Sequence, residues 1–191
     1  MSSGVLVVDN LSPFTPNILS LLNQLGAKAD CMRYDLVQAN HIEYAERVIL
    51  SGRRSGSAQT NAHNSRFIRQ CKEGRKCLLG ICYGAEIIAL SLGGTVTRMP
   101  APSRGLEQIN IASDTPITRG MEKSISVYQS HAFRVARLPQ GFMQVANSNQ
   151  TPYEIFCDER MAMWGTQFHP EKSGVVGEAL MRNFLALDAP G

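Results

Sequence analysis

A short apolar segment that leads into a cysteine between two glycines constrains the fold of this chain most strongly. Residues Cys77–Ile81 form an apolar run that ends in Gly80-Ile81-Cys82-Tyr83-Gly84, and a helix-like segment follows at Ala85–Leu92. A strand that passes directly into a helix needs a sharp turn, and small residues two positions before and after the turning residue prevent collisions. The pattern indicates a nucleophile elbow, which exposes the sulfur of Cys82 above a sheet edge.

The elbow would place Cys82 at the start of a helix, where the positive end of the helix dipole favours negative charge. We therefore expect the pKa of its thiol to be lowered, which favours the reactive thiolate. The backbone N–H of Tyr83 would be one donor to the oxyanion that forms when a cysteine attacks a carbonyl. The alternative is a small, buried, structural cysteine, and the two flanking glycines argue against it.

Strand and helix patterns alternate through the first half of the chain. Strands are predicted at Val5–Val8, Ala29–Arg33, Val48–Leu50 and Cys77–Ile81, and helices from Thr15 to the stop signal at Gly26, at Asn64–Lys72 and at Ala85–Leu92. This alternation is typical of a parallel sheet. In such a sheet the ligand lies at the carboxyl ends of the strands, where Cys82 and the loop after Leu50 fall.

The second half is more strand-like. Strands are predicted at Gln108–Ala112, Ser124–Tyr128, Phe142–Ala146, Glu154–Phe156 and Met161–Thr166, and a closing amphipathic helix at Val175–Leu187. We therefore expect an α/β fold with an open, mainly parallel sheet, helices on both faces and an antiparallel extension in the second half. The length suits a single domain over residues 1–191.

Composition and charge exclude several function classes. The net charge of +3 is too small to indicate nucleic-acid binding, and no motif for it is present. No apolar run approaches the ~20 residues that span a bilayer. The five cysteines are odd in number and lack the spacing of a zinc site or a disulfide framework. We expect a cytoplasmic protein without a metal or cofactor.

A cysteine nucleophile needs a base, and His169 is the strongest candidate among four histidines. It lies in Gln167-Phe168-His169-Pro170-Glu171, directly after a predicted strand. In an extended segment Glu171 would project to the same side as His169 and orient its ring, completing a triad of nucleophile, base and orienter. A zinc site of Cys82, His169 and Glu171 is the competing interpretation, but a metal ligand does not require a strained elbow.

Two further segments are candidates for the same site. The Gly52-Arg53 turn after the third strand is the expected source of the second oxyanion donor. Ser130-His131 is a polar pair that could line the pocket, although a hydrogen-bonded structural histidine is an equal alternative.

Taken together and in order, these motifs resemble those of a class I glutamine amidotransferase domain. The resemblance rests on the Cys82 elbow, Leu92-Gly93-Gly94, Ser130-His131 and the His169-Pro170-Glu171 segment, and it covers essentially the whole chain. It implies a triad of Cys82, His169 and Glu171 that hydrolyses the side-chain amide of glutamine through a thioester. It also implies a partner that receives the ammonia, namely a separate synthase domain or subunit.

The sequence departs from the family pattern at two positions. The family loop after the third strand usually reads Ser-Gly-Gly-Pro-Gly or Ser-Pro-Gly-Pro-Gly, whereas this chain has Ser51-Gly52-Arg53-Arg54-Ser55-Gly56. Loss of one oxyanion donor typically costs ~10²–10³ in rate, so this loop predicts slow activity until a partner reshapes it. Glu86 occupies the position of a glutamine that helps to hold the substrate, and a carboxylate cannot donate to the substrate carbonyl.

The resemblance leaves the ammonia acceptor open. Cys82-Tyr83-Gly84 and the stretch from Ser130-His131 to Ala146-Asn147-Ser148 are similar to the glutaminase of guanosine monophosphate synthetase, which we favour. The opening Asp9-Asn10-Leu11-Ser12-Pro13 resembles the anthranilate and aminodeoxychorismate synthase glutaminases. A stand-alone γ-glutamyl hydrolase and a catalytically altered regulatory relative remain as alternatives.

Overall fold

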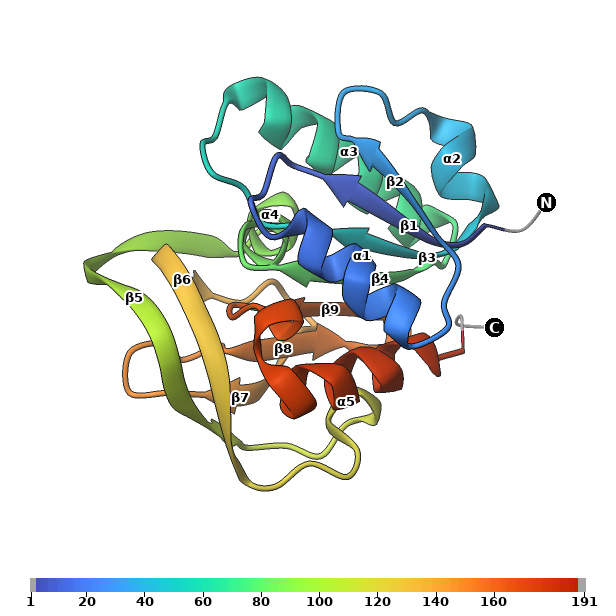
Figure 1. Cartoon of the computed structure of the whole chain (residues 1–191). Coiled ribbons are helices and arrows are strands. Elements are labelled where there is room, and N and C mark those ends of the chain that lie inside the picture. Colours follow the sequence, from blue (N-terminus) through green and yellow to red (C-terminus); the bar gives the residue numbers. More distant parts are fainter. Residues whose placement is uncertain (1–2, 189–191) are drawn as a thin grey trace.

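Nine strands form one sheet within residues 3–188, the part of the chain that the computed structural model describes (Figure 1). The strands are β1 (Ser3–Asp9), β2 (Ala29–Arg33), β3 (Ala45–Leu50), β4 (Cys77–Ile81), β5 (Thr95–Ile111), β6 (Ser124–Arg137), β7 (Met143–Asn147), β8 (Ile155–Asp158) and β9 (Met163–Thr166). Their order in the sheet is β2-β1-β3-β4-β9-β8-β7-β5-β6.

The pairing directions confirm the predicted mixed sheet. The pairs β2–β1, β1–β3, β3–β4 and β4–β9 are parallel, whereas the pairs β9–β8, β8–β7, β7–β5 and β5–β6 are antiparallel. The apolar runs that predicted β1, β3 and β4 are covered on both faces, as expected for strands inside a parallel sheet.

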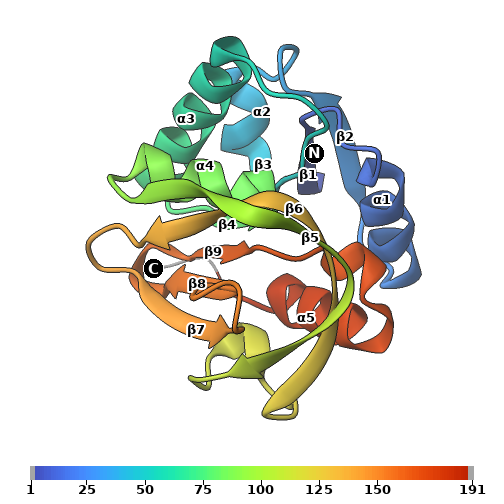
Figure 2. The ribbon, with the colours of Figure 1, turned by 90° about the vertical axis from the view of Figure 1, so that its left-hand side faces the viewer.

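Helices cover both faces of the sheet, as predicted. They are α1 (Thr15–Gln24), α2 (Ala39–Tyr44), α3 (Ala58–Glu73), α4 (Tyr83–Ser91) and α5 (Gly174–Leu185), with 3₁₀ turns η1 (Pro116–Thr118), η2 (Glu159–Met161) and η3 (Pro170–Lys172). Figure 2 shows α1 and α5 on one side of the sheet and α2, α3 and α4 on the other. Each set packs into its own apolar cluster, with Leu22 and Phe184 in one and Phe67 and Ile88 in the other.

Helix boundaries differ from the predictions where the sequence is polar. Helix α3 begins at Ala58 rather than Asn64, because the Ser57 side chain accepts a hydrogen bond from the Thr60 N–H and caps a polar first turn. Helix α2 was not predicted, since only Ile42 of its six residues is buried and no apolar period is present.

Strands β5 and β6 are longer than predicted and form an antiparallel ribbon. Their pairing runs from Thr95↔Arg137 to Asn110↔Ser124, with a register shift between Arg98 and Ser103 where two prolines lie. Most of β5 before Ile109 is exposed or half-buried, so the alternation that marks a half-buried strand is missing from its sequence.

Strand β9 joins the parallel part of the sheet to the predicted antiparallel extension. It lies parallel to β4, with Leu78↔Met163 and Ile81↔Thr166 in register, and it joins the antiparallel strands through β8. The chain therefore returns from the far edge to the middle of the sheet. This return brings the residues after Thr166 beside the turn that follows β4.

Candidate active site

Cys82 forms the predicted elbow between β4 and α4. Its backbone has φ 53° and ψ −107°, a conformation that non-glycine residues rarely adopt. Such strain costs about 1–3 kcal/mol and persists only where the surroundings impose it. The Cys82 N–H donates to the Thr166 carbonyl at 2.7 Å, so the elbow is anchored directly to the end of β9.

The two glycines of the elbow are required by backbone packing. A Cβ atom on Gly84 would overlap the carbonyl oxygen of Leu50 at the end of β3, and a Cβ on Gly80 would overlap the backbone of Gly84. Neither obstacle is a flexible side chain. The glycines flanking Cys82 therefore allow β3, β4 and α4 to approach closely, as the sequence pattern predicted.

His169 and Glu171 are held together beyond the end of β9. The His169 Nδ1 and Glu171 Oε1 atoms are 2.7 Å apart, and both side chains are almost completely buried. The segment is not extended as predicted, because Pro170–Lys172 forms the 3₁₀ turn η3. The turn still directs the carboxylate to the ring, and Glu171 Oε2 has no hydrogen-bond partner within residues 3–188.

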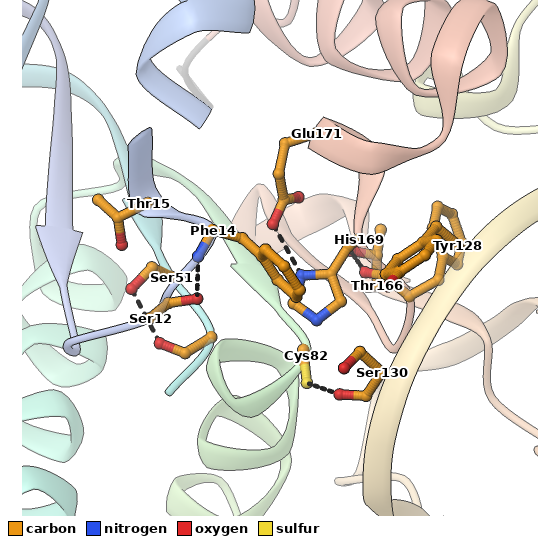
Figure 3. Close-up of polar contacts among 12 residues, drawn as sticks. Ser12, Phe14, Thr15, Ser51, Cys82, Tyr128, Ser130, Thr166, His169 and Glu171 are labelled. Carbon is orange, nitrogen blue, oxygen red and sulfur yellow. Dashed lines mark hydrogen bonds and ion pairs between the residues drawn. The ribbon is translucent and has the colours of Figure 1, made fainter. Parts of the chain in front are cut away.

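The imidazole faces the elbow. Figure 3 shows the second ring nitrogen of His169 directed toward Cys82, with the Phe14 ring packed against the imidazole. The Phe14 and His169 ring centroids are 4.8 Å apart in an edge arrangement. A Cβ on Gly52 would lie 3.2 Å from His169 Cε1 and 3.7 Å from Cys82 Cβ. Three segments that lie far apart in the sequence therefore converge at one point.

The electrostatic setting of Cys82 differs from the prediction. Burial holds the pKa of its thiol well above the usual value, and the negative charge of Glu86 raises this pKa further. The Tyr83 backbone N–H and the Arg53 guanidinium act in the opposite direction but do not outweigh burial. The prediction of a lowered pKa was wrong, because desolvation exceeds the local effect of the helix start. The resting thiol directs its proton to the Ser130 carbonyl, 3.9 Å away.

A cavity of about 490 Å³ opens over Cys82. Its size lies within the range of small-molecule sites. The cavity is lined by predicted site residues and by three arginines, namely Cys82, Tyr83, Glu86, Ser130, His131, His169, Arg53, Arg54 and Arg104. Glu171 does not line the cavity but lies behind His169, whose ring it contacts. Gly52 lies against Cys82 and His169.

Glu86 is a buried carboxyl group in the cavity wall, one helical turn beyond Cys82. Burial raises its pKa, and the amide of Gln167 donates to its Oε1 atom at 3.2 Å. This amide and the positive charge of Arg53 lower the pKa without overcoming burial. The protonated form of such a group both donates and accepts hydrogen bonds, as a carboxamide does.

His131 lines the cavity, but its ring nitrogens are already engaged. Nδ1 contacts the Phe133 carbonyl at 2.7 Å, and Nε2 contacts Gln129 Oε1 at 2.9 Å. Burial lowers the pKa of His131. These hydrogen bonds favour the structural interpretation of His131, whereas the Ser130 carbonyl lies 3.9 Å from the Cys82 sulfur.

Several residues of the site carried no recognisable signal in the sequence. Phe14, which packs on His169, lies in the loop before α1. Asn61 in α3 accepts hydrogen bonds from both Arg53 and Tyr83. Gln167 was part of the His169 segment but had no assigned role. Only the spacing of Gln167 from His169 could have indicated that its buried side chain supports Glu86 in the cavity wall.

Two negative findings concern residues 3–188. No group of three or more His, Cys, Asp and Glu side chains gathers there as a metal site would require. Within the same range, every helix is too short or too polar to cross a membrane.

Comparisons with known proteins agree on one family. Residues 6–187 match the family model described as Glutamine amidotransferase class-I. The chain is 32% identical over 189 residues to the glutamine-hydrolyzing GMP synthase of Campylobacter lari, covering 95% of this chain and 36% of the relative. The glutamine-hydrolyzing GMP synthase of Aquifex aeolicus is 30% identical over 184 residues, again with 36% of its length covered. The chain thus spans about a third of these curated relatives.

Solved structures share the fold. A protein of Thermoplasma acidophilum, provisionally named as one subunit of a GMP synthase, superposes with a TM-score of 0.88 at 25% identity, covering 97% of this chain and 93% of that one. A glutamine amidotransferase of Thermotoga maritima gives a TM-score of 0.82 at 18% identity, with 97% of both chains covered. The second similarity is one of fold alone.

Proposed function

The chain belongs to the class I glutamine amidotransferase family of enzymes, and we propose on this basis that it hydrolyses the side-chain amide of glutamine and delivers the ammonia to a synthase partner. The main support is that the Cys82 thiol and the His169–Glu171 pair meet at the wall of one cavity. We propose Cys82 as nucleophile, His169 as general acid and base, and Glu171 as the residue that orients His169.

In the proposed reaction, His169 Nε2 takes the thiol proton as the sulfur attacks the amide carbon. This transfer is needed because burial keeps the pKa of Cys82 high. Glu171 holds the Nδ1–H proton and stabilises the imidazolium. The oxyanion lies between the Tyr83 N–H and the Gly52–Arg53 turn.

The tetrahedral intermediate then collapses. His169 returns the proton to the amide nitrogen, the C–N bond breaks, and ammonia leaves a glutamyl thioester on Cys82. Water attacks this thioester while His169 takes one of its protons. Breaking the C–S bond releases glutamate, and His169 restores the Cys82 thiol.

Glu86 is proposed to bind the substrate together with Ser130 and His131. Its raised pKa favours a neutral carboxyl group that donates one hydrogen bond and accepts another. In this form it can replace the carboxamide that the family usually has at this position. Ser130 contributes its backbone beside the sulfur, and His131 contributes the ring that closes the cavity wall.

We propose a guanosine monophosphate synthetase as the partner type. The curated relatives named above are GMP synthases that extend well beyond the matched region, and the Thermoplasma protein carries the name of a GMP synthase subunit. The proposed unit is a single glutaminase domain over residues 1–191. We place it in the cytoplasm, where its five free thiols would remain reduced.

The test is glutamate release from glutamine by the purified chain, alone and with candidate synthase partners that hold their own substrates. Glutamine labelled with ¹⁵N in its amide then follows nitrogen into the synthase product. The proposal requires Cys82-dependent release and label transfer with the guanosine monophosphate partner. Transfer only with an anthranilate-type partner would correct the pathway, and rapid release without any partner would indicate a stand-alone hydrolase. No release in any mixture would leave a regulatory relative.

A further inference from the structure

The Arg53 guanidinium is held on three sides. Its Cζ atom lies 3.8 Å from the centroid of the Tyr83 ring, and its Nη1 donates to Asn61 Oδ1 at 2.9 Å. The Tyr83 hydroxyl donates to the same oxygen, also at 2.9 Å. On the other side the backbone of Gly56 approaches so closely that a Cβ there would overlap the guanidinium. We call Arg53, Gly56, Asn61 and Tyr83 the arginine clamp.

The clamp anchors a loop that has few other restraints. Ser51 is fixed by Asn10, whose N–H donates to the Ser51 hydroxyl at 2.9 Å. Within residues 3–188, however, Arg54, Ser55 and Gly56 make no hydrogen bond, whereas the Arg53 side chain bonds to Asn61 and interacts with Tyr83. The loop also lacks a proline that would stiffen it. Its conformation between Gly52 and Ser57 therefore depends on the arginine side chain.

The two ends of the clamp carry the two proposed oxyanion donors. One proposed donor lies in the Gly52–Arg53 turn, which includes the backbone of Arg53. The other is the backbone N–H of Tyr83, and the Arg53 guanidinium stacks on the ring of this tyrosine. Oxyanion donors are effective only when they are fixed before the charge develops. A contact that joins the side chains of both segments can fix their separation.

We propose that Arg53 is a positioning residue, whose stacking on Tyr83 and bond to Asn61 hold the Gly52–Arg53 turn and the Tyr83 N–H in register as one oxyanion hole. The inference rests on the proposed glutaminase function. It also gives a physical reason for the unusual loop, because a tertiary clamp supplies rigidity that a proline would otherwise give to the backbone. The positive charge of Arg53 also opposes the effect of Glu86 and Glu171 on the pKa of Cys82.

Two substitutions break the clamp by different routes. Arg53→Ala removes the guanidinium and its charge, whereas Gly56→Ala keeps the charge and displaces the guanidinium by one methyl group. The obstacle at Gly56 is the end of a flexible side chain, and Gly56 has no positive φ, so this substitution disturbs the fold little. Arg53→Lys keeps the charge without the planar stack. Arg69→Ala, an exposed arginine on α3, is the control.

Three measurements separate positioning from other roles. The first is the kcat and KM of glutamine hydrolysis, with the synthase partner present in a parallel series. The second is the rate at which iodoacetamide alkylates Cys82, followed to its plateau at high pH. This alkylation displaces iodide from a saturated carbon and develops no oxyanion. The third is amide hydrogen exchange of the peptide covering residues 51–57, corrected for sequence.

The clamp predicts a loss confined to the acyl-transfer chemistry. We expect kcat to fall about 10- to 100-fold in Arg53→Ala and Gly56→Ala, up to the range for a misplaced or missing donor. The glutamine KM should change less than threefold, and the alkylation plateau should stay the same. Amide hydrogen exchange of residues 51–57 should accelerate at least tenfold in both variants. Arg53→Lys should recover only part of kcat, and Arg69→Ala should match the wild type.

Unchanged loop exchange in Arg53→Ala and Gly56→Ala would refute the clamp. Faster exchange with an unchanged kcat would refute its role in catalysis, as would an equal loss of kcat and of the alkylation plateau. If the wild type hydrolyses no glutamine under any condition, the proposed function fails, and the oxyanion role of Arg53 fails with it. Loop exchange would then still decide whether the clamp holds the loop.

Discussion

Replacing Glu171 with glutamine should separate the activity of this protein from its stability. The wild-type carboxylate accepts the Nδ1–H proton of His169 at 2.7 Å, in a site where both side chains are almost fully buried. Glu171→Gln preserves the shape and one acceptor oxygen but removes the negative charge. The ring can still be oriented, whereas the imidazolium of the proposed mechanism loses its counter-charge.

The size of the effect follows from that single contact. A distance of 2.7 Å is typical of a charge-assisted hydrogen bond. Hydrogen bonds to charged groups contribute about 1.5–3 kcal/mol. At ~1.36 kcal/mol per tenfold change in rate, removing the charge should lower kcat/KM about 10- to 150-fold. Burial favours the upper part of this range, because solvent does not screen the pair.

Stability should not follow activity. Glu171 Oε2 has no hydrogen-bond partner within residues 3–188, so the buried carboxylate is incompletely compensated. Removing a buried charge recovers several kcal/mol of desolvation, which offsets the ~1–3 kcal/mol for a buried amide without a partner. We expect the melting temperature of Glu171→Gln to stay within a few degrees of the wild type or to rise.

The assay is steady-state glutamate release with the synthase partner present, combined with thermal unfolding of the same preparations. Glu178→Gln, on the exposed surface of α5, is the matched control because it makes the same chemical change. A kcat/KM of Glu171→Gln within threefold of the wild type would refute the role of Glu171. A loss of activity that only parallels a large drop in melting temperature would make the residue structural.

Three further predictions concern the elbow and the cavity. Cys82→Ala should reduce glutamate release to background while the melting temperature changes by only a few degrees, and residual Cys82-independent release would contradict the mechanism. Gly84→Ala should lower stability by about 1–3 kcal/mol, because its Cβ would overlap the Leu50 carbonyl; an unchanged melting temperature would show that the elbow is less tightly packed. Burial raises the pKa of Glu86 above its usual 4.5, so the wild type loses stability as pH rises from that value through the pKa in the folded protein. Glu86→Gln should therefore gain in melting temperature over the wild type at pH 8 but not at pH 4, and an equal difference at both pH values would contradict the shift.

Local patterns were sufficient for the elements whose signal lies within a few neighbouring residues. The bounds of β2 and β4 match the predictions, and α5 differs by one residue at its start and two at its end. Elements with a polar or exposed sequence were underestimated, as in the β5–β6 ribbon and the first turns of α3. Hydrophobic periodicity misses segments that bury little, as in most of β5, and segments that bury polar side chains, as at Gln129 and His131 in β6.

The sequence by itself determined the strand–elbow–helix around Cys82 and the pairing of His169 with Glu171, because each depends on residues within a few positions of one another. Only the tertiary structure decided that β9 returns beside β4 and brings His169 to Cys82. The arginine clamp and the raised pKa of Cys82 also depend on the tertiary structure. A helix start acts over one turn, whereas desolvation and long-range contacts depend on every segment packed around a group.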